Sequence, residues 1–454
     1  MLTRASDSNR SRTLALLLAS VATVAGCGGG GDDSGSGGAP LIGAPAPSPS
    51  PAPSPAPSPA PSPAPSCISA GTLCVGSGQT YATIQAAVNA AVAGNTVVVQ
   101  DGNYAGFSVS RSGTAAIPLV IRAAGTGAVI DRANSSGEGI TLNNTSYVTI
   151  EGFTITGMSG YGLATHNASP TNPMRGLLIR NNTVRNSGSS NIYLSEVADS
   201  LVEGNSASGS KASHGIYLAN GGSDNTTLRG NRCFSNFKNG IHLNGDQSVG
   251  GDGLHTGINL DGNVLYANTD NGMDIDGMQN STVQNNLVYG NGRNALRVFQ
   301  IDGAAGPKNL RIVNNTLSVS SGWAIKLTED GGGHVIFNNI LWAESGASGS
   351  LAVANTALTS DSNVAVDRFS VDGDNTTISL AAWKARGYDG ASLLSTASAL
   401  FVNAAAADYR LKAGAPAGNA GRASLAGVSA PAADIVGAAR PAGGAIDIGA
   451  YETN

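Results

Sequence analysis

An asparagine that recurs at near-regular intervals constrains the fold of this chain more than any other feature. It occupies the same place in seven motifs, namely IRNNTV, VEGNSA, LRGNRC, LDGNVL, VQNNLV, IVNNTL and IFNNIL. These asparagines are Asn182, Asn205, Asn231, Asn263, Asn286, Asn315 and Asn339. Successive copies are 23 to 32 residues apart, which is near one solenoid turn with insertions in the longer intervals. The repeat predicts stacked coils whose asparagine amides bond one coil to the next in a ladder.

A second phrase follows the asparagine at an almost constant distance. Its copies are HGIYLAN, NGIHLNG, NGMDIDG, NALRVFQ and WAIKLTE. If each phrase is a strand, the apolar residues face one side and the middle residue faces the other. The middle residue lies 11 or 12 residues after the ladder asparagine of its coil. This register predicts one exposed column of chemically reactive side chains, made of Tyr193, Tyr217, His242, Asp274, Arg297 and Lys326.

A second outward column is expected two positions further along each strand. Its members are Ser195, Ala219, Asn244, Asp276, Phe299 and Thr328. Insertions follow the His242 and Arg297 strands, at Gly245–Gly257 and Ile301–Asn309. Loops that leave the same edge of adjacent coils are expected to form one wall of a groove beside these columns.

Composition narrows the class of protein. Only 12% of the 454 residues are charged, and 62 are glycine, which argues against a helical bundle and for short strands joined by tight turns. The net charge is −5 and no basic block lies outside the extreme N-terminus, so nucleic acid is not expected as a partner.

The N-terminus has the pattern of an exported protein. Residues 1–27 place arginines before an apolar run that is too short to span a bilayer stably. The run ends in VAGC, which resembles the bacterial lipobox, and the resemblance implies a lipid anchor on Cys27. Gly28 follows where an Asp would imply retention in the inner membrane, so an outer-membrane lipoprotein is expected; plain secretion is the alternative. Residues 28–66 are rich in Gly, Ser and Pro and are typical of a semi-rigid spacer.

Three further cysteines complete the set of four. Cys67 and Cys74 lie close together in a chain predicted to be exported, so they are plausible disulfide partners. Cys233 occupies a position that is apolar in other repeats, which indicates a buried thiol.

The segments before and after the repeat region, taken together with the coils, resemble those of a known protein family. Thr80–Tyr104 reads as a short amphipathic helix followed by a buried strand, and the chain ends in RPAGGAIDIGAYE. With the asparagine coils, these segments make roughly residues 75–454 resemble the pectin-lyase-like superfamily. The resemblance implies an all-β, right-handed parallel β-helix with an N-terminal capping helix. It implies a β-helix domain over 67–355, which residues 356–454 complete or cover.

In that superfamily acidic polysaccharides are commonly bound on the outer face of the helix and are cleaved or epimerised there. A lyase must neutralise the uronate carboxylate with a cation and remove the neighbouring C5 proton with a base. Arg297 and Lys326 would supply the cations. Either His242 or Tyr217 would be the base and the other the proton donor, with Asp274 orienting its neighbours.

Several other residues are candidates for binding rather than for catalysis. Substrate contacts are predicted for Tyr193, His214, Asn244, Asp276, Phe299 and His255, and His214 has a turn-capping role as its alternative. Some lyases of the superfamily that this chain resembles use Lys or Arg as the base and calcium to neutralise the carboxylate. Calcium is therefore left open as a cofactor through Asp246, Asp252, Asp274 and Asp276. His166 and His334 are weaker candidates, and Trp323 is expected either in the core or on a sugar ring.

The function expected from these patterns is a surface-anchored lyase, acting as a monomer on a polysaccharide that contains uronic acid. A C5-epimerase needs nearly the same residues. A hydrolase would use Asp274 and Asp276 as paired carboxylates, since NTDNGMDID resembles a stretch of polygalacturonase-type enzymes. A non-catalytic glycan-binding surface protein is a further alternative, in which the column is a solvated face and Asp274–Arg297 is an ordinary ion pair.

Overall fold

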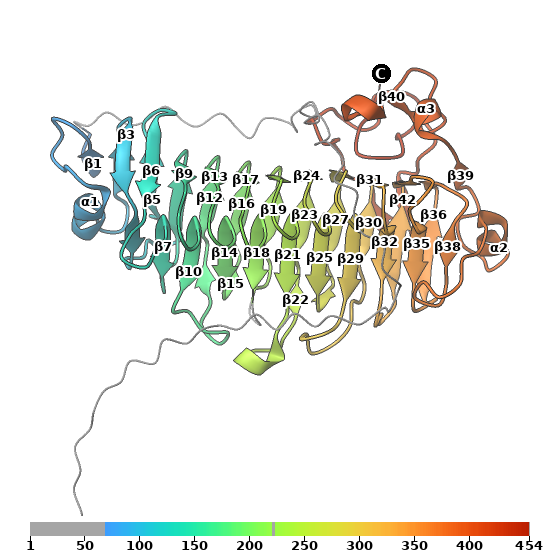
Figure 1. Ribbon diagram of the computed structural model, residues 1–454, viewed down its shortest axis with the longest axis horizontal. Coiled ribbons are helices and arrows are strands. Elements are labelled where there is room, and N and C mark those ends of the chain that lie inside the picture. Colours follow the sequence, from blue (N-terminus) through green and yellow to red (C-terminus); the bar gives the residue numbers. More distant parts are fainter. Residues whose placement is uncertain (1–68, 220–222, 454) are drawn as a thin grey trace, which may run out of the picture. The chain divides into compact units, whose positions relative to one another are not determined.

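The computed structural model describes residues 69–219 and 223–453 as coils stacked into three long parallel sheets (Figure 1). In each coil the chain passes through sheet A, then sheet B, then sheet C. Sheet A has 12 strands in the described residues: β1 (Thr72–Val75), β2 (Thr96–Val99), β5 (Leu119–Ala123), β8 (Val148–Glu151), β12 (Leu178–Arg180), β16 (Leu201–Glu203), β19 (Thr227–Arg229), β23 (Asn259–Asp261), β27 (Thr282–Gln284), β30 (Arg311–Val313), β33 (His334–Phe337) and β36 (Leu358–Asp361).

Sheets B and C follow the same order along the stack. Sheet B contains β3 (Gly102–Ala105), β6 (Ala128–Arg132), β9 (Thr154–Thr156), β13 (Thr183–Arg185), β17 (Ser206–Ser208), β20 (Arg232–Phe234), β24 (Val264–Tyr266), β28 (Leu287–Tyr289), β31 (Thr316–Val319), β34 (Ile340–Ala343), β37 (Val364–Ala365) and β39 (Leu393–Leu394). Sheet C contains β4 (Phe107–Val109), β7 (Ile140–Asn143), β10 (Leu163–His166), β14 (Ile192–Ser195), β18 (Ile216–Ala219), β21 (Ile241–Asn244), β25 (Met273–Asp276), β29 (Leu296–Phe299), β32 (Trp323–Leu327), β35 (Gly349–Val353) and β38 (Phe369–Ser370).

Smaller elements lie at the edges of these sheets. They are the parallel pairs β11 (Met174–Arg175) with β15 (Val197–Ala198) and β22 (His255–Thr256) with β26 (Met278–Gln279), the antiparallel pairs β40 (Phe401–Asn403) with β41 (Asp408–Leu411) and β42 (Ser424–Leu425) with β43 (Val428–Ser429), and the helices α1 (Ile84–Ala90), α2 (Leu380–Lys384), α3 (Ala397–Leu400), η1 (Gln247–Val249) and η2 (Ala404–Ala406). The all-β solenoid predicted from the repeat is therefore confirmed.

The asparagine ladder predicted from the sequence is present and runs one coil further, to Asn363. Asn263 shows its pattern: the side-chain amide donates to Asn286 Oδ1 at 3.0 Å and to the Leu228 carbonyl at 2.9 Å. Its own Oδ1 accepts from the Asn231 backbone amide at 3.0 Å. The ladder thus satisfies buried backbone groups at a turn, where an unpaired group costs free energy.

The residue before each ladder asparagine explains the rest of the repeated motif. Asn181, Asn285 and Asn314 have φ values of 55°, 55° and 53°, and the glycines at the matching positions also have positive φ. Among residues with a side chain, asparagine tolerates this left-handed backbone best, and glycine has no Cβ to clash. Hence the motif reads NN or GN in the seven copies found in the sequence, and Ser362, with a φ of 54°, takes this position before Asn363.

The helix predicted near the start of the domain is α1. Thr83 caps it by accepting a hydrogen bond from the Ala86 amide at 3.2 Å, and Ile84, Ala87 and Val88 are buried. The helix packs against β1, β2 and β4. That α1 serves as the cap of the solenoid end stays a prediction. In the described part of the chain, every helix is too short or too polar to cross a membrane.

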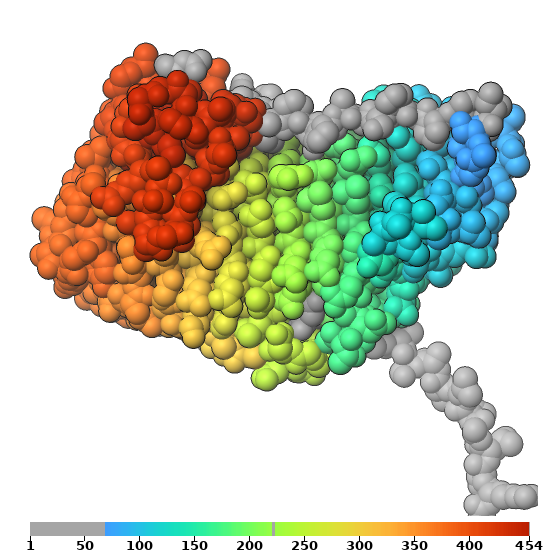
Figure 2. Space-filling view, turned by 180° about the vertical axis from the view of Figure 1, so that it is seen from behind, coloured from blue at the N-terminus to red at the C-terminus, as the bar shows by residue number. Residues whose placement is uncertain are grey.

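The three sheets continue past residue 355, the predicted boundary, because β36 to β39 add to them. At that end Trp383 of α2 is fully buried and stacks on Phe369 with 5.2 Å between ring centroids. The following residues fold back along the side of earlier coils, where they form the red segment of Figures 1 and 2. The DIGAYE motif is part of that segment and contacts later coils: Ala450 donates its backbone amide to Thr316 Oγ1 at 3.0 Å, and Gly449 donates to the Asn338 carbonyl at 2.8 Å.

Most of the N-terminal predictions fall outside the described residues. They concern the export signal 1–27 with Cys27, the spacer 28–66, and Cys67. Cys74 is disulfide-bonded. Cys233 is a free, fully buried thiol, as its apolar position predicted.

Candidate functional site

The predicted column forms on sheet C. Strand pairing places Tyr193, Tyr217, His242, Asp274, Arg297 and Lys326 opposite one another on successive strands. Side-chain exposure is 13% for His242, 10% for Asp274, 32% for Arg297 and 23% for Lys326. We call this row, from Tyr193 to Lys326, the sheet C strip.

His242 is held in one tautomer. Its Nδ1 lies 2.8 Å from the backbone carbonyl of Asp274, and a carbonyl only accepts, so Nδ1 carries the hydrogen. Nε2 is then left with a lone pair, and it has no hydrogen-bond partner among the described residues. Burial is the largest of the causes that lower the pKa of His242 to about 4, and the nearby cations Lys238 and Arg297 act in the same direction. The imidazole is therefore neutral near pH 7 and can accept a proton.

His214 lies against His242 in the opposite tautomer. The two rings are stacked with centroids 4.3 Å apart. The backbone amide of Asn239 donates to His214 Nδ1 at 3.3 Å, so the hydrogen of this ring is on Nε2. Burial and the neighbouring His242 hold the pKa of His214 well below its usual value. Two neutral imidazoles therefore lie side by side: His242 has an acceptor nitrogen at Nε2, and His214 has a donor N–H at Nε2.

Tyrosine rings complete this cluster. Tyr217 contacts both histidines, with ring centroids 5.1 Å from His214 and 4.9 Å from His242. Tyr193 meets Tyr217 edge to face at 5.4 Å, and Tyr161 stacks on Tyr193 at 4.5 Å. Burial raises the pKa of Tyr217, as do nearby phenols and carboxylates, so its hydroxyl stays protonated at any ordinary pH. The Tyr217 hydroxyl can therefore donate a proton near neutral pH, and which of His242 and Tyr217 is the base stays a prediction.

Asp274 connects the histidines to the cationic half of the strip. Asn271 donates to Asp274 Oδ1 at 3.0 Å and Asn239 to Oδ2 at 3.4 Å. Arg297 Nη1 lies 3.5 Å from Asp274 Oδ1. Burial raises the pKa of Asp274 to about 6, although Arg297 opposes the shift. Asp274 thus contacts Asn239, Asn271 and Arg297, and its role in orienting its neighbours stays a prediction.

Two cations follow His242 along the strip. The guanidinium of Arg297 lies over the Phe299 ring, 4.0 Å from its centroid, which fixes its plane. Lys326 forms an ion pair with Asp374, a residue that is distant in sequence. Arg297 is thus the more accessible cation for a substrate carboxylate.

The two insertions lie beside the strip and bond to each other, as the sequence predicted. Gln247 donates its backbone amide to the Asp302 carbonyl at 3.1 Å, and Ala304 donates to the Gly253 carbonyl at 3.2 Å. Figure 1 shows η1 projecting below the strands at this point.

The second outward column is narrower than expected because this wall covers part of it. Asp276 has 0% exposure, and its carboxylate accepts from the amides of Ile301 and Asp302 at 3.1 and 2.7 Å. Phe299 and Ala219 are also buried, whereas Ser195 and Asn244 are partly exposed. Asp276 supports the loop in this arrangement, so it is not available as a hydrolase carboxylate or as a substrate contact.

The aspartates proposed for calcium do not gather into one cluster. Asp246 accepts from Ser248 at the start of η1, and Asp252 accepts from the Leu254 amide. Within residues 69–219 and 223–453, no three His, Cys, Asp or Glu side chains are placed to share a metal ion. A calcium requirement stays a prediction for experiment.

The remaining histidines lie outside the stacked pair of His214 and His242, although the ring centroid of His166 is 6.1 Å from that of Tyr193 and 6.2 Å from that of Tyr161. His255 is fully buried under the wall, with Nδ1 bonded to the Ser223 carbonyl at 3.2 Å, so it does not border the strip as predicted. His166 bonds Glu138 at 2.7 Å, and His334 bonds Asp330 at 2.6 Å in the interior. Trp323 is buried in the core.

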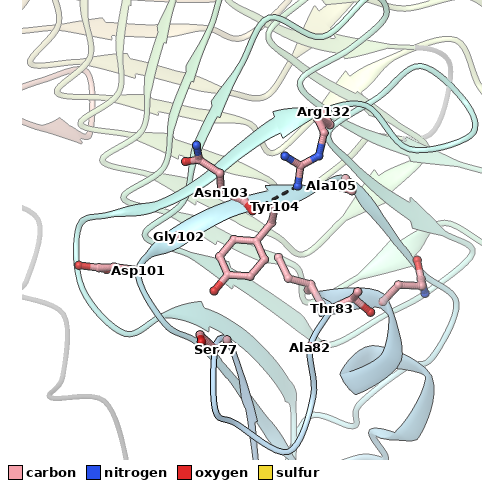
Figure 3. Close-up of a pocket in the computed structure, with 13 residues that line it drawn as sticks. Ser77, Ala82, Thr83, Asp101, Gly102, Asn103, Tyr104, Ala105 and Arg132 are labelled. Atoms are coloured by element: carbon pink, nitrogen blue, oxygen red, sulfur yellow. Dashed lines mark hydrogen bonds between the residues drawn. The ribbon is translucent and has the colours of Figure 1, made fainter.

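A separate cavity of about 520 Å³ lies at the other end of the domain (Figure 3). Tyr104, Asp101 and Arg132 line it together with the start of α1. Its polar groups are used internally: Tyr104 donates to the Gln100 carbonyl at 2.9 Å and Arg132 to the Asn103 carbonyl at 3.2 Å. We assign no chemistry to this cavity.

Parallel strands stacked in successive coils, with a polar strip on the outside, are the features of a parallel β-helix protein. Comparison with known protein families gives the same class. Residues 128–251 and 212–371 match the family described as "Right handed beta helix region". Because these matches span more than half of the chain, the protein belongs to the right-handed β-helix family.

Solved structures with a similar fold include three enzymes. Pectate lyase Pel9A has 16% identity and a TM-score of 0.45, over 82% of this chain and 91% of that one. The Azotobacter vinelandii mannuronan C-5 epimerase AlgE6 A-module has 16% identity and a TM-score of 0.45, over 69% and 93%. An alginate lyase from Paenibacillus sp. str. FPU-7 has 17% identity and a TM-score of 0.39, over 61% and 93%. No curated protein sequence matches the chain.

Proposed function

We propose that this protein is a polysaccharide lyase that cleaves a uronic-acid-containing glycan by β-elimination on the sheet C strip. One observation carries the proposal: neutral His242 presents a free Nε2 between a protonated Tyr217 and the Asp274–Arg297 pair. Base, proton donor and cation are the three groups that the reaction needs.

Each group has one task in the reaction. The Arg297 guanidinium binds the uronate carboxylate in a bidentate manner and stabilises the charge that develops when C5 loses its proton. His242 Nε2 takes that proton. A double bond forms between C4 and C5, the C4–O bond breaks, and the Tyr217 hydroxyl gives a proton to the leaving oxygen. The negative charge of the bound uronate raises the pKa of His242 from its low value, which makes the imidazole a better base.

His214 is a positioning residue in this proposal. Its ring covers one face of His242 at 4.3 Å and keeps water from that side. The asparagines Asn239 and Asn271 hold Asp274, whose backbone carbonyl fixes the tautomer of His242. The base therefore reaches the substrate with its lone pair already aimed, which is the benefit of a preorganised site.

A C5-epimerase is the second candidate, and the same cluster favours it. After His242 removes the C5 proton, a donor on the opposite face of the sugar would return one without cleavage. The protonated hydroxyl of Tyr217 would serve this step. The two reactions share their first half and differ in which atom receives the second proton.

The test is a panel of uronic acid polymers incubated with the full chain, with and without EDTA. Alginate, pectate and a glycosaminoglycan are followed by the ultraviolet absorbance of unsaturated uronate and by NMR for epimer change. The lyase proposal expects the absorbance; its absence together with an NMR change would select the epimerase. Loss of turnover with EDTA would establish the calcium requirement. Binding without either signal would overturn both enzymes in favour of a glycan-binding protein.

Variants of the strip check the assignment. We expect His242→Ala to lower kcat/KM by about 10²- to 10⁴-fold, the usual contribution of a general base. Arg297→Ala should remove most activity, whereas Arg132→Ala, an exposed arginine at the separate cavity, should leave it unchanged. Full activity of His242→Ala would contradict the assignment of the base.

We further propose that the protein is anchored in the cell envelope through a lipid on Cys27. Labelling with a radioactive fatty acid in the native host, with Cys27→Ser as the control, tests this placement.

A further inference from the structure

The sheet C strip ends abruptly beyond Lys326. The next strand in sheet C is β35, and strand pairing places Ala352 opposite Lys326 and Ser370 opposite Ala352. Both are in the outward register of the column, yet both have 0% exposure. A segment of chain must therefore cover the outer face of the last two strands.

The covering segment is a hairpin over residues 369–378. Phe369 and Ile378 exchange backbone hydrogen bonds of 2.9 and 2.8 Å at its base. The Asp372 carboxylate accepts from the Ser370 hydroxyl at 2.7 Å and from the Thr376 amide at 3.0 Å. Gly373 also donates to the Val353 carbonyl of β35 at 3.0 Å. These bonds fix the 369–378 hairpin against sheet C.

The tip of the 369–378 hairpin meets the strip at its last cation. Asp374 reaches over Ala352 and pairs with Lys326, and 41% of the Asp374 side chain is exposed. In the other direction the strip continues over the half-buried rings of Tyr193 and Tyr161, which are stacked at 4.5 Å. The strip is thus closed at one end and continues past the catalytic cluster at the other.

The position of this closure limits what binds beyond the base. Lys326 is three strands from His242, through Asp274 and Arg297. At the strand spacing of a β-sheet, three steps are about 14 Å, which accommodates only a few sugar units. An exposed carboxylate at that point accepts hydrogen bonds, and the hydroxyls of a terminal sugar can donate them. An internal stretch of the polymer would instead meet a path that the hairpin blocks.

We infer that the protein acts on the end of its polysaccharide, with the 369–378 hairpin as the stop and Asp374 as the residue that receives the terminal sugar. This inference rests on the proposed function and adds its mode of action. Short oligosaccharides are released from the chain end, while the remaining polymer extends over the tyrosine side of the strip.

The experiment follows polymer length and product length together. The full chain is incubated with whichever uronan it turns over, and samples are taken while only a small share of the bonds is broken. Size-exclusion chromatography should then show polymer of nearly the starting length, and mass spectrometry should show short products alone. A broad range of intermediate lengths at this stage would overturn the inference while leaving the lyase proposal intact. Absence of turnover or epimerisation on the whole panel overturns both.

Two variants test whether the 369–378 hairpin limits the length of the products. Replacing Asp372–Asn375 by two glycines should open the end of the strip, so that intermediate lengths appear and the mean polymer length falls several-fold more at equal turnover. Asp374→Ala is a milder change that keeps the hairpin, and we expect longer products and a higher KM for short oligosaccharides. Asp199→Ala breaks a comparably exposed ion pair with Arg175 and serves as the matched control. If the shortened variant does not fold, the products of Asp374→Ala are the remaining test. Products of unchanged length from Asp374→Ala would contradict the role of the hairpin in ending the strip.

Discussion

At the residue scale, burial sets the chemistry of this site. His242 and Asp274 were selected from the sequence by register alone, and strand pairing brings them together. Their protonation was not readable from the sequence, because it depends on how far each group is removed from water. Burial lowers the pKa of His242 to about 4 and raises that of Asp274 to about 6. Near neutral pH the pair is therefore a neutral base beside an ionised carboxylate.

These shifts predict how stability depends on pH. Unfolded histidine titrates near 6.5, so between about pH 6.5 and 4 the unfolded chain binds a proton at position 242 that the folded chain does not. This difference destabilises the fold as pH falls through that window, and buried His214 acts in the same direction. Asp274 acts in the opposite direction, since its folded form binds the proton first below about pH 6.

We expect His242→Asn to lose less stability than the parent chain between pH 7 and pH 4.5, and Asp274→Asn to lose more. Thermal unfolding monitored by circular dichroism at the two pH values measures this. The exposed His166, which has 34% side-chain exposure, provides the control His166→Asn. Identical pH dependence in all three variants would contradict the burial of the imidazole.

At the element scale, asparagine stacks connect the coils. The sequence identified one of them, and the structure contains two more. Asn236, Asn268 and Asn291 bond in series at the turn that leads from sheet B to sheet C, with amide-to-carbonyl distances of 2.9 and 2.8 Å. Asn239, Asn271 and Asn294 form the third stack, in which Asn239 and Asn271 contact Asp274. These stacks have fewer members and lack a long shared motif, so the sequence pattern around them is weaker.

The main ladder should be sensitive to single substitutions. Asn263→Ala removes two donated bonds and leaves the Asn231 amide and its backbone N–H without their acceptor. Each buried polar group left unpaired costs about 1–3 kcal/mol, so we expect a loss of at least about 2 kcal/mol. Urea unfolding measures the change, and Asn375→Ala, at an exposed loop position, is the matched control. A loss no larger than that of the control would show that the ladder is dispensable.

At the scale of the whole molecule, the C-terminal segment packs against the side of the later coils. Tyr409 continues a row of stacked rings on sheet B, with its ring centroid 4.9 Å from that of Tyr289. Asn314 donates to the carbonyl of Asp447 at 2.9 Å, and Asn285 donates to that of Ala433 at 3.0 Å. The DIGAYE ending was expected to complete or cover the last coils. Its contacts show that it covers the flank of coils formed more than 100 residues earlier.

A buried ion pair locks this segment. Arg440 and Glu452 lie 2.8 Å apart with 0% side-chain exposure on both sides. Removing one partner of such a pair leaves an uncompensated charge, so Glu452→Ala should cost about 3–5 kcal/mol. The Arg410–Asp408 pair is more exposed, and Asp408→Ala should cost about 1 kcal/mol or less. Chemical unfolding of the two variants measures the difference, and equal losses would contradict the role of the buried pair.

The sequence by itself determined the coils, the main ladder and the column on sheet C, because each depends on a period that repeats along the chain. Side-chain alternation in a strand is fixed by backbone geometry, so counting residues was enough to place His242, Asp274 and Arg297 in one row. Tertiary structure alone decided what covers that row. Asp276 and His255 are buried under loops, and Asp374 closes the strip from 48 residues beyond Lys326. Such contacts join segments that share no period, and their energy comes from burial and pairing that exist only after the coils have stacked.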